Sequence, residues 1–269
     1  MAITTLDGAL AGMQPPVAIA KAVGGTMVAG RPHSFYQIAG NPGAGALNGT
    51  LNGAALSSSS TIPNGIIRHV DPVSGNAHLA RLAASVSQPG VLLLCDRLWD
   101  NTSAIATGAQ SITFPGLPAR DNAGTTNGDG VLAAVECITA NSATAAAVTL
   151  TYTNQAGTAS RTASFSDATA ATATTVGDFH RIGLQAGDTG IRSIQSVNFT
   201  TAWTSGTLGL VLYRVLAQLE IVAANVGNAI DALTGGFPRL YNGTCPFLVF
   251  VPSTTTSSNI TGTYLETQG

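Results

Sequence analysis

Short apolar segments separated by turn residues fill the chain from about residue 76 onward, and this pattern restricts it to a mostly β fold. In the clearest segment, Val148, Leu150 and Tyr152 alternate with threonines, which is the period of a half-buried strand. The turn sequence at 154–157 then leads into 158–165, which predicts a β-hairpin. Further strands are expected at 78–86, 91–99, 110–114, 131–139, 178–184, 191–199, 206–221 and 247–251. Short strands at this spacing predict an antiparallel β-sandwich or jelly-roll-like core with at most short helices.

The most apolar stretch, 208–222, fits two structures. Its apolar positions match a helical stripe, but every second residue from Val211 to Ile221 is also apolar, and the turn sequence Thr-Ser-Gly-Thr precedes it. We therefore expect a strand. Charged residues such as Arg214 and Glu220 interrupt the stretch, and no apolar run reaches the ~18 residues of a membrane helix, so no membrane partner is predicted.

Residues 1–75 differ from the rest of the chain. They are rich in turn and loop sequences, for example at 14–16, 41–43 and 57–60. Large apolar residues are scattered among these turns: Phe35, Tyr36, Ile38, Ile62, Ile66 and Ile67. We expect an extended Gly/Ala-rich N-terminal arm with a short helix around 6–13, ordered by packing on its own core or on a partner.

The chain divides accordingly into an N-terminal arm with loops (1–75), a β-sandwich core (76–222) and a C-terminal segment (223–269) that packs on the core. Within the C-terminal segment, 225–234 predicts a short helix, because the two glycines at 235–236 provide a stop. The Ser/Thr-rich stretch 253–264 is expected to be an edge strand or a draped terminal segment.

Charge is scarce in this sequence. Only 9% of the residues are charged, against about 25% in ordinary domains, and Lys21 is the single lysine among 11 basic residues. The net charge of −2 disfavours nucleic-acid binding. Interfaces are enriched in Arg and depleted in Lys, Asp and Glu, so this composition suits a chain that buries much of itself against neighbours. High-GC coding is the alternative explanation of the missing lysines, but it does not account for the scarcity of Asp and Glu.

The three cysteines, Cys95, Cys137 and Cys245, are far apart and have no metal-ligand spacing. Cys95 and Cys137 lie in apolar runs and are expected to be buried thiols. The N-terminal residues show no secretory signal, so we expect the thiols to be reduced. No metal and no cofactor is predicted.

Motifs for catalysis are missing from the sequence. It contains no G-x-S-x-G elbow, no H-E-x-x-H and no phosphate-binding loop. Of the histidines His33, His69, His78 and His180, two adjoin an arginine, which opposes a charged imidazole. Ordinary polar contacts are expected for them, no catalytic residue is predicted, and the protein is expected not to be an enzyme. The alternative is a hydrolase that joins one of these histidines to a serine and an aspartate.

One acidic loop, 121–130, allows two interpretations. Asp121, Asn122, Asn127 and Asp129 carry oxygen atoms that calcium could use, although the EF-hand spacing and its bidentate glutamate are missing. The Asn-Gly and Asp-Gly pairs equally predict a surface turn in which glycine supplies the positive φ.

A second charged group, Asp96, Arg97 and Asp100, lies beside Trp99 at the end of an expected strand. These side chains could line a binding cleft. A local salt bridge at the strand end is the other interpretation, and we favour it.

Six segments, in order along most of the chain, resemble a known family. They are GMQPP at 12–16, HSFYQIAGNPG at 33–43, LCDRLW at 94–99, LPAR at 117–120, NGDG at 127–130 and LQAGDTG at 184–190. Together they resemble virion structural proteins of tailed bacteriophages, of the head decoration (cement) type. The resemblance implies a β-rich, homo-oligomeric protein, expected as a trimer, that binds the major capsid protein or other virion proteins on the capsid exterior after assembly in the host cytoplasm. None of these segments has a defined chemical role, so the resemblance assigns no catalytic, cofactor-binding or metal-binding residue.

Two other functions fit the same sequence. A tail-tube, tail-tip or fibre protein would share its composition. A carbohydrate-binding adhesin of the β-sandwich class is the other, and Trp99, Trp203 and five tyrosines are the residues that suggest it.

Overall fold

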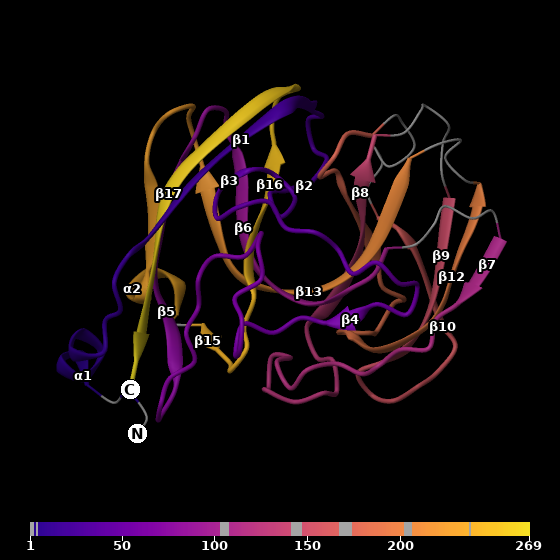
Figure 1. Ribbon diagram of the computed structural model, residues 1–269, viewed down its shortest axis with the longest axis horizontal. Coiled ribbons are helices and arrows are strands. Elements are labelled where there is room, and N and C mark those ends of the chain that lie inside the picture. Colours follow the sequence, from indigo (N-terminus) through magenta and orange to yellow (C-terminus); the bar gives the residue numbers. More distant parts are fainter. Residues whose placement is uncertain are drawn as a thin grey trace.

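Antiparallel β-sheets, curled into a sandwich-like core, make up most of the protein, as the computed structural model in Figure 1 shows. The structure describes residues 3, 5–102, 108–140, 147–166, 174–201, 206–236 and 238–269. The mostly β fold class expected from the sequence is confirmed. In this part of the chain the helices are short, and none is long and apolar enough to cross a membrane.

The elements follow one another in this order: α1 (Leu6–Ala11), β1 (Val17–Met27), β2 (His33–Ser34), β3 (Gly40–Asn41), β4 (Ala54–Ala55), β5 (Ala77–Val86), β6 (Gly90–Asp100), β7 (Gly108–Ser111), β8 (Val131–Thr139), β9 (Ala147–Asn154), β10 (Arg161–Phe165), β11 (Phe179–Gly183), β12 (Ile191–Thr201), β13 (Thr207–Ile221), β14 (Asn228–Asp231), α2 (Ala232–Gly235), β15 (Arg239–Leu240), β16 (Pro246–Pro252) and β17 (Thr256–Gln268). The ambiguous stretch 208–222 is thus a strand, as expected.

The strands form two sheets. The small sheet has six strands in the order β14-β5-β17-β1-β3, with β15 also paired to β5. The large sheet has 11 strands in the order β2-β16-β6-β13-β8-β11-β10-β9-β12-β7, with β4 also paired to β6. Because the large sheet is so long, it curls back on itself instead of staying flat.

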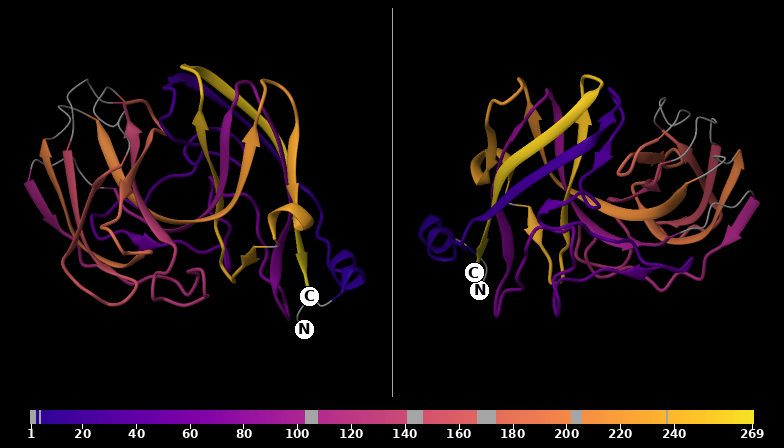
Figure 2. Two further views of the ribbon diagram at one scale, coloured as in Figure 1. Left: turned by 180° about the vertical axis from the view of Figure 1, so that it is seen from behind. Right: turned by 45° about the horizontal axis from the view of Figure 1, so that its top comes forward.

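Two hydrophobic cores fill the two lobes that Figures 1 and 2 show. The first core lies between the small sheet and strands β16, β6 and β13, and it contains Leu82, Leu94 and Ile260. The second core lies inside the curled remainder of the large sheet and contains Leu150 and Val197.

Strand β13 passes from one core to the other. Its residues Leu208, Leu210 and Leu212 belong to the second core, whereas Leu219 and Ile221 belong to the first. The pairing of β13 with β6 shifts register twice along the way. Such bulges bend a strand and re-aim its side chains, and this allows one strand pair to serve both cores.

The region expected to be an extended arm contributes a regular strand. β1 pairs along its length with β17 and, through two residues, with β3. Ile19 and Val23 face the first core, and Lys21 between them is buried as well. The expected short helix is present as α1, and Tyr36 and Ile66 from the following loops pack over Phe247 and Cys95 on the other face of the large sheet.

Two expectations for the C-terminal segment need correction. The short helix predicted at 225–234 is confined to α2 at the glycine stop, and most of the predicted range is the strand β14 and the turn before it, because the backbone of β14 pairs with β5. The stretch 253–264 is not at an edge, because β17 lies between β5 and β1 and pairs with both. In both places the long-range pairing partner, which the local pattern does not reveal, decides the structure.

Replacing Leu94 tests the packing of the first core. Leu94→Ala is expected to lower the free energy of unfolding by about 2–5 kcal/mol, because a fully buried leucine is replaced by a cavity. Urea unfolding followed by circular dichroism measures the change. Val222→Ala, at a position that is 68% exposed, serves as the control and is expected to change stability by less than about 0.5 kcal/mol. Equal effects of the two substitutions would contradict this packing.

Candidate functional site

Charged side chains are concentrated inside the protein rather than on its surface. Eleven of those described are buried: Lys21, Arg31, Asp96, Arg97, Asp100, Arg120, Asp121, Glu136, Asp178, Arg214 and Glu266. Seven are exposed: Asp7, Arg68, Arg81, Arg192, Glu220, Asp231 and Arg239. Buried charges are tolerated only where partners compensate for lost hydration. The buried network is therefore the candidate site, and its contacts decide whether it is structural or chemical.

Arg97 lies at the centre of this network and is fully buried. Its Nε donates to Asp100 Oδ2 at 2.6 Å, and its Nη1 donates to Glu136 Oε2 at 2.7 Å. The guanidinium also lies 3.9 Å from the centroid of the Tyr36 ring, in a cation–π contact. Burial disfavours the charge, but Glu136 and Asp100 outweigh it and raise the pKa of Arg97. The arginine is therefore held as a cation between two carboxylates.

Asp96 attaches two further segments to the same strand. Its Oδ1 accepts a hydrogen bond from the backbone nitrogen of Cys245 at 2.9 Å, and its Oδ2 lies 3.2 Å from Nε of Arg120. Arg120 in turn donates to the carbonyl oxygen of Arg97 at 3.0 Å. Loop 115–130 and the turn before β16 are both held against β6 by these contacts.

Lys21 holds the N-terminal loops in the same way. Its Nζ donates to the carbonyl oxygens of Phe35 and Ile38 at 2.7 and 2.9 Å. Burial lowers the pKa of Lys21 to about 8, although the charge of Glu136 opposes that change. The single lysine of the chain is thus a structural tie and no part of the surface.

The group Asp96, Arg97 and Asp100 forms a salt bridge and no open cleft. The local pair expected from the sequence, Arg97 with Asp100, is present, and Trp99 beside it is fully buried. Sequence reasoning missed Glu136 as a partner of Arg97 and Arg120 as a partner of Asp96. Glu136 had a signal, because it is a charged residue within the apolar run of β8.

His33 pairs with a buried carboxylate. Its Nδ1 lies 3.2 Å from Asp178 Oδ1, and Arg31 donates to Oδ2 of the same carboxylate at 2.9 Å. Burial would raise the pKa of Asp178, but hydrogen bonds from His33 and Thr175 and the charge on Arg31 lower it. Asp178 is thus held as a carboxylate within the fold.

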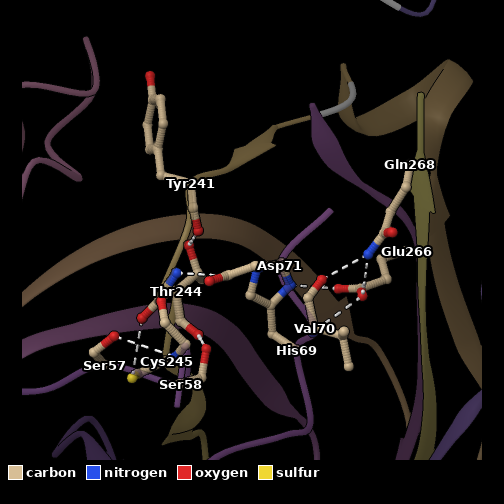
Figure 3. A network of polar contacts seen from close by, with 12 residues as sticks. Ser57, Ser58, His69, Val70, Asp71, Tyr241, Thr244, Cys245, Glu266 and Gln268 are labelled. Carbon is tan, nitrogen blue, oxygen red and sulfur yellow. Dashed lines mark hydrogen bonds and ion pairs between the residues drawn. The ribbon is translucent and has the colours of Figure 1, made fainter. Parts of the chain in front are cut away.

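His69 lies between two carboxylates, as Figure 3 shows. Its Nδ1 is 2.7 Å from Glu266 Oε2, and its Nε2 is 3.4 Å from Asp71 Oδ1. Tyr264 donates to Glu266 at 3.1 Å, and the backbone nitrogen of Gly243 donates to Asp71 at 2.6 Å. Because both ring nitrogens face carboxylates, neither is directed at a serine hydroxyl. The arrangement ties the loop at 69–71 to the end of β17.

The other two histidines lie in strands, with His180 buried in β11 and His78 half-buried in β5.

The three cysteines are free and buried, as expected for Cys95 and Cys137. Burial raises the pKa of Cys245 to about 12 and that of Cys137 to about 11. A nucleophilic cysteine needs a lowered pKa and access to solvent, and these thiols have neither.

The loop 121–130 folds around the carboxylate of Asp121. Oδ1 accepts from the backbone nitrogens of Ala123 and Thr125 at 3.0 and 2.6 Å, and Oδ2 accepts from the Thr125 hydroxyl and the Gly128 nitrogen at 2.6 and 3.0 Å. Gly128 has a φ of 86°, as expected for the turn interpretation. Asp121 therefore directs its oxygens at its own loop, and the described residues contain no cluster of three or more His, Cys, Asp or Glu that could hold a metal.

The aromatic residues that suggested carbohydrate binding are mainly interior. Trp99 is fully buried, as are four of the five tyrosines: Tyr36, Tyr152, Tyr213 and Tyr264. Tyr241 is half-buried and lies beside Arg214 and Arg239. Trp203 falls outside the described residues. A sugar-binding platform needs exposed aromatic faces, and these side chains do not provide one.

No protein-family model and no curated protein sequence matches the chain. Three solved structures align over most of it. They are T=1 particles derived from infectious bursal virus (8% identity, TM-score 0.17, 96% of this chain and 79% of that one), infectious bursal disease virus strain Gt (10%, 0.16, 95% and 82%), and the VP2 subviral particle of infectious bursal disease virus (9%, 0.16, 96% and 81%). Likeness at this level carries no argument about fold or function.

Removing the central cation tests the network. Arg97→Met leaves Asp100 and Glu136 buried without their partner and is expected to lower the free energy of unfolding by about 3–5 kcal/mol. The triple variant Arg97→Met, Asp100→Asn, Glu136→Gln should recover much of this loss, because no uncompensated charge remains. Urea unfolding provides the measurement. Arg192→Met on the surface is the matched control, and a loss no larger than the control's would show that the network does not stabilise the fold.

The reactivity of the thiols provides a second test. Native protein at pH 8 is expected to leave all three cysteines unreacted with Ellman's reagent, because they are buried and their pKa values are raised. After unfolding in guanidinium, all three thiols should react. Fast reaction of any cysteine in the native state would contradict the burial of the thiols.

Proposed function

We propose that the protein is a non-enzymatic structural component of a virion that binds and stabilises a capsid lattice as a decoration (cement) protein. The observation that carries this proposal is the distribution of charge. Most charged residues are buried or half-buried. The fraction of charged residues on the surface is therefore lower than the low fraction in the whole sequence. Surfaces that meet other proteins are depleted in charge in this way, whereas free soluble domains keep a charged surface.

The outward face of the small sheet is the clearest part of this surface. Ala18, Ala20 and Ala22 of β1 are exposed and alternate with core residues. Ala83 of β5 and Thr261 of β17 continue the same face. Small neutral side chains lose little conformational entropy on contact and allow close approach of a neighbour, so this face suits dense packing in a lattice.

The buried network supports a structural role rather than catalysis. Its carboxylates Asp178, Glu266 and Glu136 are paired with arginine or histidine side chains, and burial raises the pKa of the thiols of Cys137 and Cys245. The sequence resemblance to head decoration proteins points to the same role. Partners would be the major capsid protein or other virion proteins and further copies of this chain, on the exterior of the capsid.

Intact particles provide the test. Quantitative mass spectrometry of purified virions is expected to find this protein in a copy number comparable to that of the major capsid protein, and cryo-electron microscopy should place it on the outside of the head. Particles stripped of the protein should lose DNA at lower temperature than complete particles. A few copies per particle, or density on the tail alone, would contradict the decoration role and favour the tail or fibre alternative.

A further inference from the structure

The helix α1 turns an apolar face away from the rest of the chain. Leu6 and Leu10 are 72% and 60% exposed, and Met13 is 37% exposed. Leu6 and Leu10 are four residues apart and lie on one face of the helix, and Met13 follows just beyond its end. These side chains add nothing to the core of their own chain, and grouped exposed apolar residues of this kind mark contact sites.

The helix is held in place, although its apolar face is unused. The Thr5 hydroxyl accepts from the backbone nitrogen of Gly8 at 3.0 Å and so caps the first turn. The Thr267 hydroxyl donates to the carbonyl oxygen of Ala9 at 2.5 Å, and the backbone nitrogen of Gln268 donates to that of Gly12 at 2.9 Å. Figures 1 and 2 show α1 protruding at the corner where β17 ends. A preformed, fixed helix loses little entropy when it binds.

A shallow, open groove lies on the outward face of the small sheet. It has a volume of about 620 Å³ and is lined mainly by small residues of β5, β14 and β17, among them Ala83, Ser85, Ala229 and Thr261.

The groove and α1 carry charges of opposite sign. Arg81 is the charged residue of its lining and is exposed. Asp7 is the charged residue of α1, lies between Leu6 and Leu10 in sequence and is also exposed. Neither forms an ion pair within the described part of the chain.

We propose that α1 of one copy docks in this groove of a second copy, with Leu6 and Leu10 against the small residues and Asp7 paired with Arg81. The contact has to be intermolecular, because α1 is fixed at Thr267 and Gln268, roughly 16 Å along β17 from the centre of the groove. Reciprocal docking closes a dimer, and one-way docking forms a ring where the rotation between copies closes and an open filament where it does not. The proposal concerns the free protein in solution and so goes beyond its place on a particle.

Sedimentation equilibrium and native mass spectrometry of the purified full chain test this contact. The wild type is expected to self-associate. Leu6→Ser with Leu10→Ser should weaken the association constant by about 100-fold or more, because two leucines no longer leave water. Val222→Ser, at an equally exposed valine outside α1 and the groove, is the matched control and should associate like the wild type.

A charge exchange isolates the Asp7–Arg81 pair. Asp7→Arg and Arg81→Asp are each expected to weaken association, and the double variant should recover it, because the pair is rebuilt with reversed signs. Any loss of helix caused by Asp7→Arg persists in the double variant and cannot produce recovery. Arg192→Asp is the control for a general effect of charge.

The outcomes separate this contact from the proposed function. A wild type that is monomeric at every concentration, a leucine variant that associates normally, or a charge exchange without recovery would each overturn the docking of α1. A protein that is monomeric in solution and abundant on particle heads would overturn this inference alone. Self-association through α1 in a protein that occurs in only a few copies per particle would overturn the decoration role alone.

Discussion

The pairing of Arg97 with Asp100 and Glu136 holds the point at which β6 passes from one core to the other. Leu92 and Leu94 of this strand face the first core, whereas Leu98 and Trp99 face the second. The ion network lies between these two groups, and Asp100 also accepts a hydrogen bond from the backbone nitrogen of Asn48 at 2.9 Å. The loops of the N-terminal region are therefore attached where the strand changes partners, and the arrangement of the two lobes depends on this attachment.

Placing ion pairs in the interior explains how a chain with so few ionisable residues keeps one defined fold. Burying an ion pair yields little net stability, but removing one partner leaves the other uncompensated. The ion pairs therefore raise the free energy of alternative loop packings, in which a charge loses its partner, by more than they lower the free energy of the native packing. Because these charged residues are buried, neighbouring copies of the protein repel one another only weakly through their surfaces.

Local periodicity predicted much of this fold. The strands expected at 131–139 and 206–221 correspond closely to β8 and β13, because alternation of apolar residues is a property of each segment alone. The place of β17 between β5 and β1 could not be predicted in that way, since its pairing joins the two ends of the chain. The network around Arg97 was equally hidden, because Glu136 lies on β8, which β13 separates from β6, and Arg120 lies in a loop, so that both reach the network only in the assembled sheet. Only the short-range pair with Asp100 was visible in the sequence.

The central position of β17 has a consequence for biosynthesis. β1 pairs with β17, and β5 pairs with it on the other side, so the small sheet lacks its middle strand until Thr256–Gln268 has been made. At a translation rate of about 5–20 residues per second, β1 waits for roughly 10–50 s before its partner emerges. During that interval both strands present open edges and one apolar face each. The small sheet can thus be completed only after β17 has been made, whereas the strands of the second lobe can already pair during synthesis, and β1 and β5 keep unpaired edges until then.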